Sequence, residues 1–355
     1  MKRIVLAITV VAALAACTKS EVQYEPAGEI GFAPAVKNVT KAAKPAGNLD
    51  ASQKLNVWAY WDKDGAVENA VTDYAPYNVT FLDEASFAQK TANGGITAWG
   101  GDGVAYPWPV NGALVFSGYT TPTSAETGAN GYDVTYTLGE DKMVFTNYTQ
   151  SANTASTFDL CWFNHTAGSH NNRATGTAVD VTLSHALTWI TIKAYGEGTP
   201  VASGSEWHIK SITLKDVVTV GTGTCVGTGA GKATWTLGST KSDVAVFINT
   251  DGTNIPSSEA AFETTTDGTV VIPQTPVQME VVFDYPVGTS RVEETVTVNL
   301  TLDGSKDKDG NANTAITAWQ SGYHYTYTLF FKGNEILVAP SYGAWTDSNQ
   351  TVTVE

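Results

Sequence analysis

The chain has 355 residues, of which 42% are hydrophobic and 15% are charged, and its formal net charge at pH 7 is −15. The length is enough for about two domains with cores of their own. The acidic charge argues against nucleic acid as a partner, and against binding to anionic lipid through basic patches. The low charged fraction, the 33 glycines and the abundant threonine and valine favour β-structure over helix.

The N-terminus has the features of an export signal. Two basic residues precede an apolar run at residues 4–16 that is too short to cross a bilayer, which takes about 20 apolar residues. The charged start, apolar middle and small-residue end predict a signal peptide over residues 1–16. The run ends in Leu14-Ala15-Ala16-Cys17, which resembles a bacterial lipobox, with Cys17 acylated as the new N-terminus. The alternative is an ordinary signal peptide with an incidental cysteine.

Two segments of different character follow the signal. Glu29 to Val36 is strand-like, and Ile30 and Phe32 within it lie on one face because they are two residues apart. Lys41 to Gln53 is polar, and we expect it to be exposed and flexible, as are the segments that proteases cut.

Strand-like runs with alternating or β-branched character recur through the rest of the chain. Few windows favour a helix, and the best is Asp83 to Lys90, with Asp83 as the candidate N-cap. Many short strands with frequent turns are typical of β-sandwiches. The predicted strands are Leu55–Trp61, Ala113–Tyr119, two strands within Val179–Tyr195 on either side of Ser184-His185-Ala186, Trp207–Leu214, Val244–Ile248, Val277–Tyr285, Val292–Leu302, Tyr323–Phe331, Glu335–Val338 and Thr351–Val354.

The composition changes between Asn147 and Ala178, a segment rich in threonine, serine, asparagine and glycine. We therefore place a domain boundary near residue 177, between an N-terminal domain at 17–176 and a C-terminal domain at 177–355. Cys161 and Cys225 can either pair in an oxidising compartment or serve as two small buried residues.

Two groups of residues have the composition of a chemical site without its expected geometry. His165 and His170 are candidate metal ligands, but their loop supplies no cysteine or carboxylate beside them. Asp180, Ser184 and His185 have the composition of a catalytic triad, but neighbouring residues of a strand face opposite sides. We therefore expect His185 to be structural, and we expect no catalytic residue, no metal and no cofactor.

A series of short motifs runs in order through nearly the whole chain. It resembles the motif series of the fimbrillins, the major and minor pilin lipoproteins of Bacteroidales bacteria. Phe158 to Trp162 lies where many members carry an Asp-Leu-Leu-like stretch, so Cys161 departs from the family pattern. The matching motifs are Ile30-Gly31-Phe32, Thr40-Lys41-Ala42, Leu55–Tyr60, Tyr106-Pro107-Trp108-Pro109, Leu114–Tyr119, Val181–Leu187, Ile209–Leu214, Ile272-Pro273-Gln274 and Trp319–Tyr325.

The resemblance implies a structural pilus subunit, not an enzyme, with two transthyretin-like β-sandwich domains in tandem. It also implies anchoring in outer-membrane lipid through acylated (palmitate-carrying) Cys17, and then a place in an extracellular, adhesive fimbrium. Assembly in the family uses strand exchange: a trypsin-like protease removes an N-terminal strand, and the open groove takes a strand from another fimbrial subunit. Residues 17–45 correspond to the removable strand and its linker.

Physical chemistry supports this scheme, because a removed strand leaves unpaired backbone groups and an apolar groove that another strand can fill. The apolar residues of the removable strand are Ile30, Phe32 and Val36. The alternating C-terminal segment at 351–354 is the predicted donor strand, with Val352 and Val354 entering the groove.

Cleavage after a basic residue requires an accessible lysine or arginine. Lys37, Lys41 and Lys44 qualify, but Lys44 precedes Pro45, so Lys41 is the predicted site. The nearest arginine is Arg3 in the signal, which does not fit an arginine-specific protease. A solvated linker lysine is the alternative interpretation of Lys41.

A surface glycan-binding β-sandwich lipoprotein is the alternative function. Ten tryptophans and fifteen tyrosines can form carbohydrate platforms, although most lie within strand patterns, which favours core packing. The loop at 303–311 has the acidic residues of a calcium site but not the spacing or closing glutamate of an EF-hand, so we expect a turn.

Overall fold

The structure is a computed structural model, and it is all-β in its described residues, as the composition predicts. No helix long and apolar enough to cross a membrane occurs in these residues. The described residues are 24–29, 31–36, 53–62, 75–76, 85–92, 95–101, 107–109, 113–122, 133–137, 140–150, 159–168, 179–196, 206–227, 232–257, 269–332 and 335–344.

The strands of the first half of the chain are numbered β1 to β12. They are β1 (Tyr24–Glu29), β2 (Gly31–Val36), β3 (Gln53–Asp62), β4 (Ala75–Pro76), β5 (Ala85–Ala92), β6 (Gly95–Gly101), β7 (Pro107–Pro109), β8 (Ala113–Pro122), β9 (Asp133–Thr137), β10 (Lys142–Thr149), β11 (Cys161–Gly168) and β12 (Val179–His185).

The strands of the second half are numbered β13 to β22. They are β13 (Thr188–Gly196), β14 (His208–Val218), β15 (Val220–Val226), β16 (Thr234–Leu237), β17 (Lys241–Asn254), β18 (Thr269–Val271), β19 (Gln278–Val287), β20 (Ser290–Asn299), β21 (Tyr323–Lys332) and β22 (Glu335–Ala344). Each predicted strand between residues 55 and 338 has a counterpart here, and the segment 351–354 lies outside the described residues.

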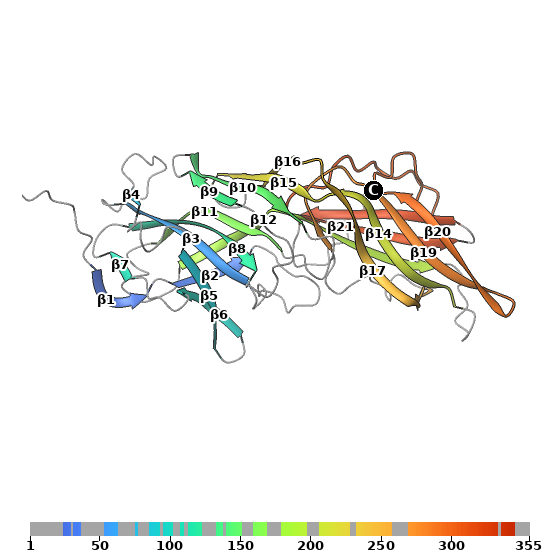
Figure 1. Cartoon of the computed structure of the whole chain (residues 1–355), viewed down its shortest axis with the longest axis horizontal. Coiled ribbons are helices and arrows are strands. Elements are labelled where there is room, and N and C mark those ends of the chain that lie inside the picture. The colour runs from blue at the N-terminus through green and yellow to red at the C-terminus, as the bar shows by residue number, and fades with distance from the viewer. Residues whose placement is uncertain are drawn as a thin grey trace, which may run out of the picture.

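The first half is built around an eight-stranded sheet in the order β4-β3-β5-β6-β2-β12-β11-β8. An additional pairing between β3 and β8 closes this sheet into a ring, which we call the β-ring (Figure 1). Closure gives most of its strands a partner on both sides, so few backbone donors and acceptors are left at an edge.

The predicted helix at Asp83 to Lys90 is wrong, because most of this segment forms β5. Leu55 of β3 is opposite Phe87 of β5, and Gln89 of β5 is opposite Trp99 of β6. Pairing with two neighbouring strands satisfies the backbone on both sides, and this outweighs a weak local preference for helix.

The second half is a sandwich of two four-stranded sheets, β18-β13-β21-β22 and β17-β14-β19-β20. One face of each sheet is turned towards the other and supplies the core. In β19, for example, Met279, Val281 and Phe283 are buried while the residues between Met279 and Phe283 are half-buried. This alternation is the strand periodicity that the sequence displays.

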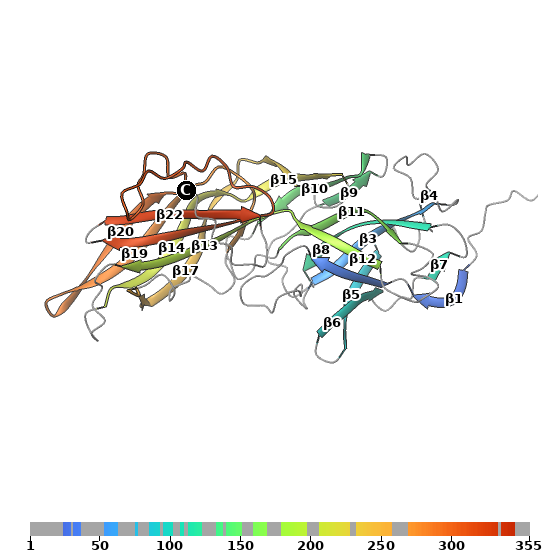
Figure 2. The ribbon, with the colours of Figure 1, turned by 180° about the vertical axis from the view of Figure 1, so that it is seen from behind.

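A further four-stranded sheet, β16-β15-β10-β9, joins the two halves, because β10 of the first half pairs with β15 of the second (Figure 2). Apolar residues from both halves pack beside it, and we call this group the joint cluster. The halves are therefore tied by a shared sheet and a shared core. The buried members of the joint cluster are Trp58, Tyr119, Met143, Phe145, Tyr148, Leu160, Trp162, Ala186, Leu187, Trp189, Cys225, Ala233, Val270 and Ile272.

The division of the chain near residue 177 stays a prediction. β12 pairs with β2 and β11 of the first half, and β13 is the first strand of the sandwich. Cys161 and Cys225 are both buried, free thiols, so the structure favours two small buried residues over a disulfide.

Candidate functional site

β2, the predicted removable strand, lies inside the β-ring between β6 and β12. It runs parallel to β12, where Phe32 is opposite Val179 and Val36 is opposite Leu183. It runs antiparallel to β6, where Phe32 is opposite Trp99. A segment near the N-terminus therefore fills a position between two strands that are distant from it in sequence.

β12 depends on β2 for most of its length. Residues 179–183 of β12 pair with β2, whereas among the described residues β12 pairs with β11 at Ser184 and His185 alone. Val179, Val181 and Leu183 are each at most 1% exposed, while Asp180 between them is exposed. The apolar face of β12 is thus buried along the length over which β12 pairs with β2.

The N-terminal segment has a second attachment point. β1 pairs antiparallel with β7, with Tyr24 opposite Pro109 and Glu29 opposite Pro107. Removal of the segment at a downstream site would free β7 as well as β6 and β12.

The remaining predicted site residues lie outside the described residues. These are Cys17, Ile30, Lys41, Lys44, Val352 and Val354. Their roles stay predictions.

A buried polar cluster, which the sequence reasoning missed, lies where β11 and β12 meet. His185 Nδ1 donates to Asp159 Oδ2 at 2.7 Å, and Cys161 Sγ lies 3.3 Å from the same oxygen and 3.6 Å from His185 Nδ1. All three residues are buried: Asp159 is 6% exposed, Cys161 is 0% exposed and His185 is 4% exposed. Burial, and then the charge of Asp159, raise the pKa of the Cys161 thiol well above its usual value.

The composition suggested Asp180, Ser184 and His185 as a group. In the structure, His185 lies with Asp159 and Cys161 instead. Asp180 is exposed and Ser184 faces away from His185, as strand alternation predicts. Both the thiol and the carboxylate contact the same imidazole nitrogen, so the cluster lacks the nucleophile–base–carboxylate relay of a triad. A carboxylate, a thiol and an imidazole are metal-ligand types, and their donor atoms lie within 4.8 Å of one another.

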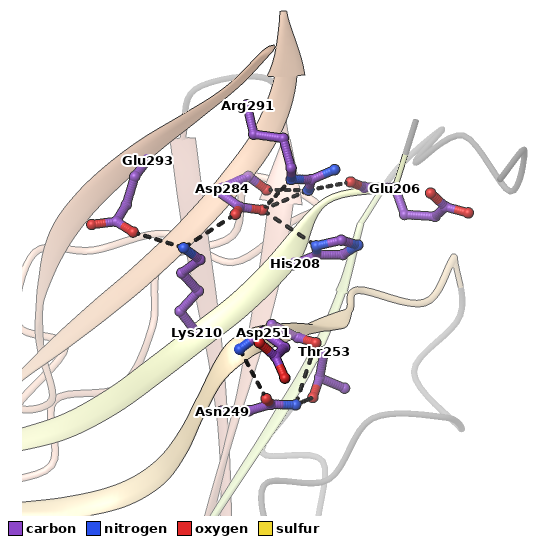
Figure 3. Close-up of polar contacts among 10 residues, drawn as sticks. Glu206, His208, Lys210, Asn249, Asp251, Thr253, Asp284, Arg291 and Glu293 are labelled. Atoms are coloured by element: carbon purple, nitrogen blue, oxygen red, sulfur yellow. Dashed lines mark hydrogen bonds and ion pairs between the residues drawn. The ribbon is translucent and has the colours of Figure 1, made fainter. Parts of the chain in front are cut away.

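A second polar cluster lies at one end of the C-terminal sandwich (Figure 3). Asp284, whose side chain is 7% exposed, accepts from Arg291 Nε at 2.8 Å and from Arg291 Nη2 at 2.5 Å. His208 and Lys210 approach the same carboxylate at 3.4 and 3.5 Å, and Lys210 also pairs with Glu293 at 3.0 Å. One buried carboxylate thus holds cationic side chains from β14 and β20 against β19.

Asp284→Asn is expected to lower the free energy of unfolding by about 1–3 kcal/mol at neutral pH, because Arg291 loses its charged acceptor. Burial alone would raise the pKa of Asp284, but the hydrogen bond and charge of Arg291, aided by His208 and Lys210, hold it below its usual value. A lowered folded-state pKa contributes stability above the unfolded pKa of about 3.9, and this is lost as pH falls through the folded value. Denaturant unfolding of both proteins should therefore show the difference shrinking below about pH 4. A difference in unfolding free energy that stays constant across that pH range would contradict the lowered pKa of Asp284.

β17 has a bulge beside this cluster, between Ile248 and Thr253, and this bulge requires glycine at position 252. Gly252 has a φ of +84°, and an added Cβ would lie 2.5 Å from His208 Cβ. Asn249 Nδ2 donates to Thr253 Oγ1 at 2.9 Å, and Asp251 N donates to Asn249 Oδ1 at 3.2 Å (Figure 3). The side chain of Asn249 thus holds the bulge on both sides of the glycine.

Gly252→Ala is expected to destabilise the sandwich by more than the roughly 1–3 kcal/mol of backbone strain alone, because it adds a clash with His208. Gly310→Ala is the matched control, since Gly310 has a φ of +86° but an open space around an added Cβ. Equal losses of unfolding free energy in the two variants would contradict the proposed clash.

The structure also bears on two other hypotheses from the sequence, a calcium-binding loop and a glycan-binding surface. In the loop at 303–311, Asp307 accepts from the backbone N–H groups of Asp309 and Asn311, so it stabilises a turn. The tryptophans whose side chains are described are buried or half-buried, and half-buried Trp207 stacks on Tyr285 with ring centroids 4.9 Å apart. The tryptophans with described side chains therefore form no exposed cluster for glycan binding.

Comparison with known proteins gives a family match and matches to solved structures. A family model described as fimbrillin-like matches residues 40–345. A solved structure of a proposed cell adhesion protein from Bacteroides uniformis has a TM-score of 0.52 at 14% identity, covering 90% of this chain and 100% of that one. A fimbrial protein from Bacteroides vulgatus gives a TM-score of 0.49 at 14% identity, covering 89% of this chain and 99% of that one. The first likeness concerns the fold alone. No curated protein matches the sequence.

Proposed function

Because the chain belongs to the fimbrillin-like family, we propose that it is a structural, non-enzymatic pilus subunit that assembles by exchanging β2 for a strand of another subunit. In this proposal the protein is exported as a lipoprotein and held in the outer membrane by Cys17. A trypsin-like protease then cuts the linker, with Lys41 as the site, and the subunit joins an extracellular adhesive fimbrium.

The main support for the proposal is the position of β2 between β6 and β12. Its removal would leave residues 179–183 of β12 without their strand partner among the described residues, and would break the pairing of β6 at Gly100. It would also uncover the apolar face of Val179, Val181 and Leu183. Such a gap binds an extended chain through backbone hydrogen bonds and side-chain pockets, so cleavage creates a site for a strand.

The replacing strand must meet two requirements set by β2. It must satisfy the backbone of β12 on one side and of β6 on the other, and it must present apolar side chains two residues apart. The C-terminal segment meets the second requirement, since Val352 and Val354 alternate with threonines. A subunit with both a removable strand and a donor tail can extend a fibre in both directions, which favours a stalk position.

Competition with the removed strand tests the exchange. The folded protein is cut with trypsin in the presence of a peptide spanning residues 28–37, or of a scrambled peptide of the same composition. The native peptide is expected to occupy the gap and suppress ladders of oligomers on a gel, while the scrambled peptide leaves them. Equal ladders with both peptides would contradict the proposal that the β2 position accepts the incoming strand.

Replacing the lipidated residue tests the anchor separately. Cys17→Ser is expected to abolish incorporation of a labelled palmitate analogue and to move the protein out of the outer-membrane fraction. Cys225→Ser is the control, since Cys225 is a buried thiol in the joint cluster. Labelling that survives in Cys17→Ser would refute lipidation at this site.

A further inference from the structure

We propose that Asp159, Cys161 and His185 together bind one divalent metal ion of the zinc type. This site goes beyond the proposed pilus function and does not depend on it. The three side chains are of metal-ligand types, their donor atoms lie within 4.8 Å of one another, and all three are buried.

The donor atoms are spaced almost as a tetrahedral zinc ion requires. Bonds of about 2.3 Å to sulfur and about 2.0–2.1 Å to nitrogen and oxygen place neighbouring donors about 3.3–3.6 Å apart. The distances from Cys161 Sγ to His185 Nδ1 and to Asp159 Oδ2 are 3.6 and 3.3 Å. His185 Nδ1 and Asp159 Oδ2, at 2.7 Å, are separated by a hydrogen bond. An ion that replaces this proton needs those two atoms to part by only about 0.6 Å.

Charge balance favours an ion in this place. A thiolate and a carboxylate supply two negative charges, and a neutral imidazole adds none, so a divalent cation makes the whole site neutral. A neutral unit can lie in a water-free interior at much lower cost than an isolated charge. On binding, the thiol proton leaves to solvent and the imidazole proton moves from Nδ1 to Nε2, so that Cys161 binds as a thiolate, Asp159 as a carboxylate and His185 as a neutral imidazole through Nδ1.

The backbone holds the ligands in position before any ion arrives. Cys161 and His185 are directly opposite in the β11–β12 pair, and Ala186 N donates to Leu160 O at 2.8 Å. Thr120 Oγ1 accepts from Cys161 N at 2.9 Å, so its hydroxyl lies beside the cluster. The same hydroxyl lies 3.3 and 3.4 Å from the carbonyl oxygens of Asp159 and Cys161, so a water molecule is the ligand that would complete four-coordination.

The site lies at the joint between the two halves. Ser321 Oγ donates to His185 O at 2.9 Å, and Trp235 Nε1 donates to Ala186 O at 2.8 Å. An ion would therefore fasten the end of β12 at the point where the chain passes from the β-ring to the sandwich. Because its ligands are at most 6% exposed, the ion is expected to bind as the chain folds and to exchange slowly afterwards.

Refolding in the presence of metal tests the site. The mature chain is unfolded, refolded with Co²⁺ or Zn²⁺, freed of excess metal by gel filtration and analysed for metal content. We expect about one ion retained per chain, and a cobalt–thiolate charge-transfer band with Co²⁺. Cys161→Ala is expected to lower the retained metal at least about tenfold and to remove the band.

The second buried cysteine supplies the control. Cys225 is as fully buried as Cys161, but it packs in the apolar joint cluster, so Cys225→Ala should retain the ion and the band. Asp159→Asn provides an independent loss of one ligand, and circular dichroism confirms that each variant is folded. Metal content near zero in the unaltered protein, or equal in Cys161→Ala and Cys225→Ala, would overturn the proposal. In that case the cluster is a hydrogen-bonded core element.

Discussion

Protein in which Lys37, Lys41 and Lys44 are all replaced by glutamine is expected to remain monomeric after a trypsin treatment that turns the unaltered protein into oligomer ladders. The reason is that an uncut linker keeps β2 between β6 and β12, where it occupies both strand edges. The tethered strand rebinds at a high effective concentration, so a donor from another molecule cannot compete with it. The measurement is a denaturing gel of unheated samples taken through the digestion.

Single replacements locate the cut within the linker. Lys41→Gln alone is expected to slow ladder formation more than Lys44→Gln, because Lys44 precedes Pro45. Lys308→Gln is the control for removing a lysine elsewhere, since Lys308 lies in the exposed loop at 303–311. Ladders from the triple variant that match those of the unaltered protein would show that assembly does not need this cleavage.

Trp162→Ala is expected to lower the free energy of unfolding by about 3–5 kcal/mol, the usual cost of truncating a fully buried tryptophan. Trp162 is 0% exposed and lies in the joint cluster, so its loss leaves a cavity that both halves line. Urea unfolding followed by far-ultraviolet circular dichroism measures the change. A loss below about 1 kcal/mol would contradict the tight packing of the joint.

Conservative replacements of two tryptophans separate packing from hydrogen bonding. Trp319 Nε1 donates to Tyr327 Oη at 2.8 Å, whereas Trp162 Nε1 has no hydrogen-bond partner among the described residues. Trp319→Phe is therefore expected to cost about 1 kcal/mol more than Trp162→Phe, the usual net value of one hydrogen bond. Equal costs would mean that the indole hydrogen bond contributes nothing.

The positions of most strands follow from the sequence because one face of each strand is buried. β12, with Val179, Val181 and Leu183 alternating with polar residues, is recognisable from this period alone. β5 is not, because its stability comes from two neighbouring strands rather than from its own residues. The insertion of β2 between β6 and β12 also depends on contacts between distant segments, which local patterns do not encode.

The cluster of Asp159, Cys161 and His185 also depends on a contact between distant segments, which local sequence patterns do not encode. Asp159 and Cys161 are two residues apart, so a shared strand face is foreseeable from sequence. Their partner His185 is 24 residues beyond Cys161, and only the pairing of β11 with β12 brings it to them. The departure of Cys161 from the family pattern was the available signal, but it carried no indication of a histidine neighbour.

Mass spectrometry of the mature protein before and after limited trypsin digestion, combined with a gel assay of assembly, shows whether cleavage of the linker and the C-terminal segment are both needed for assembly. Assembly by strand exchange predicts a clean cut after Lys41, followed by ladders that disappear when residues 351–355 are deleted. A protein that is cut at this position and stays monomeric, or that forms the same ladders without its C-terminal segment, would contradict assembly by strand exchange.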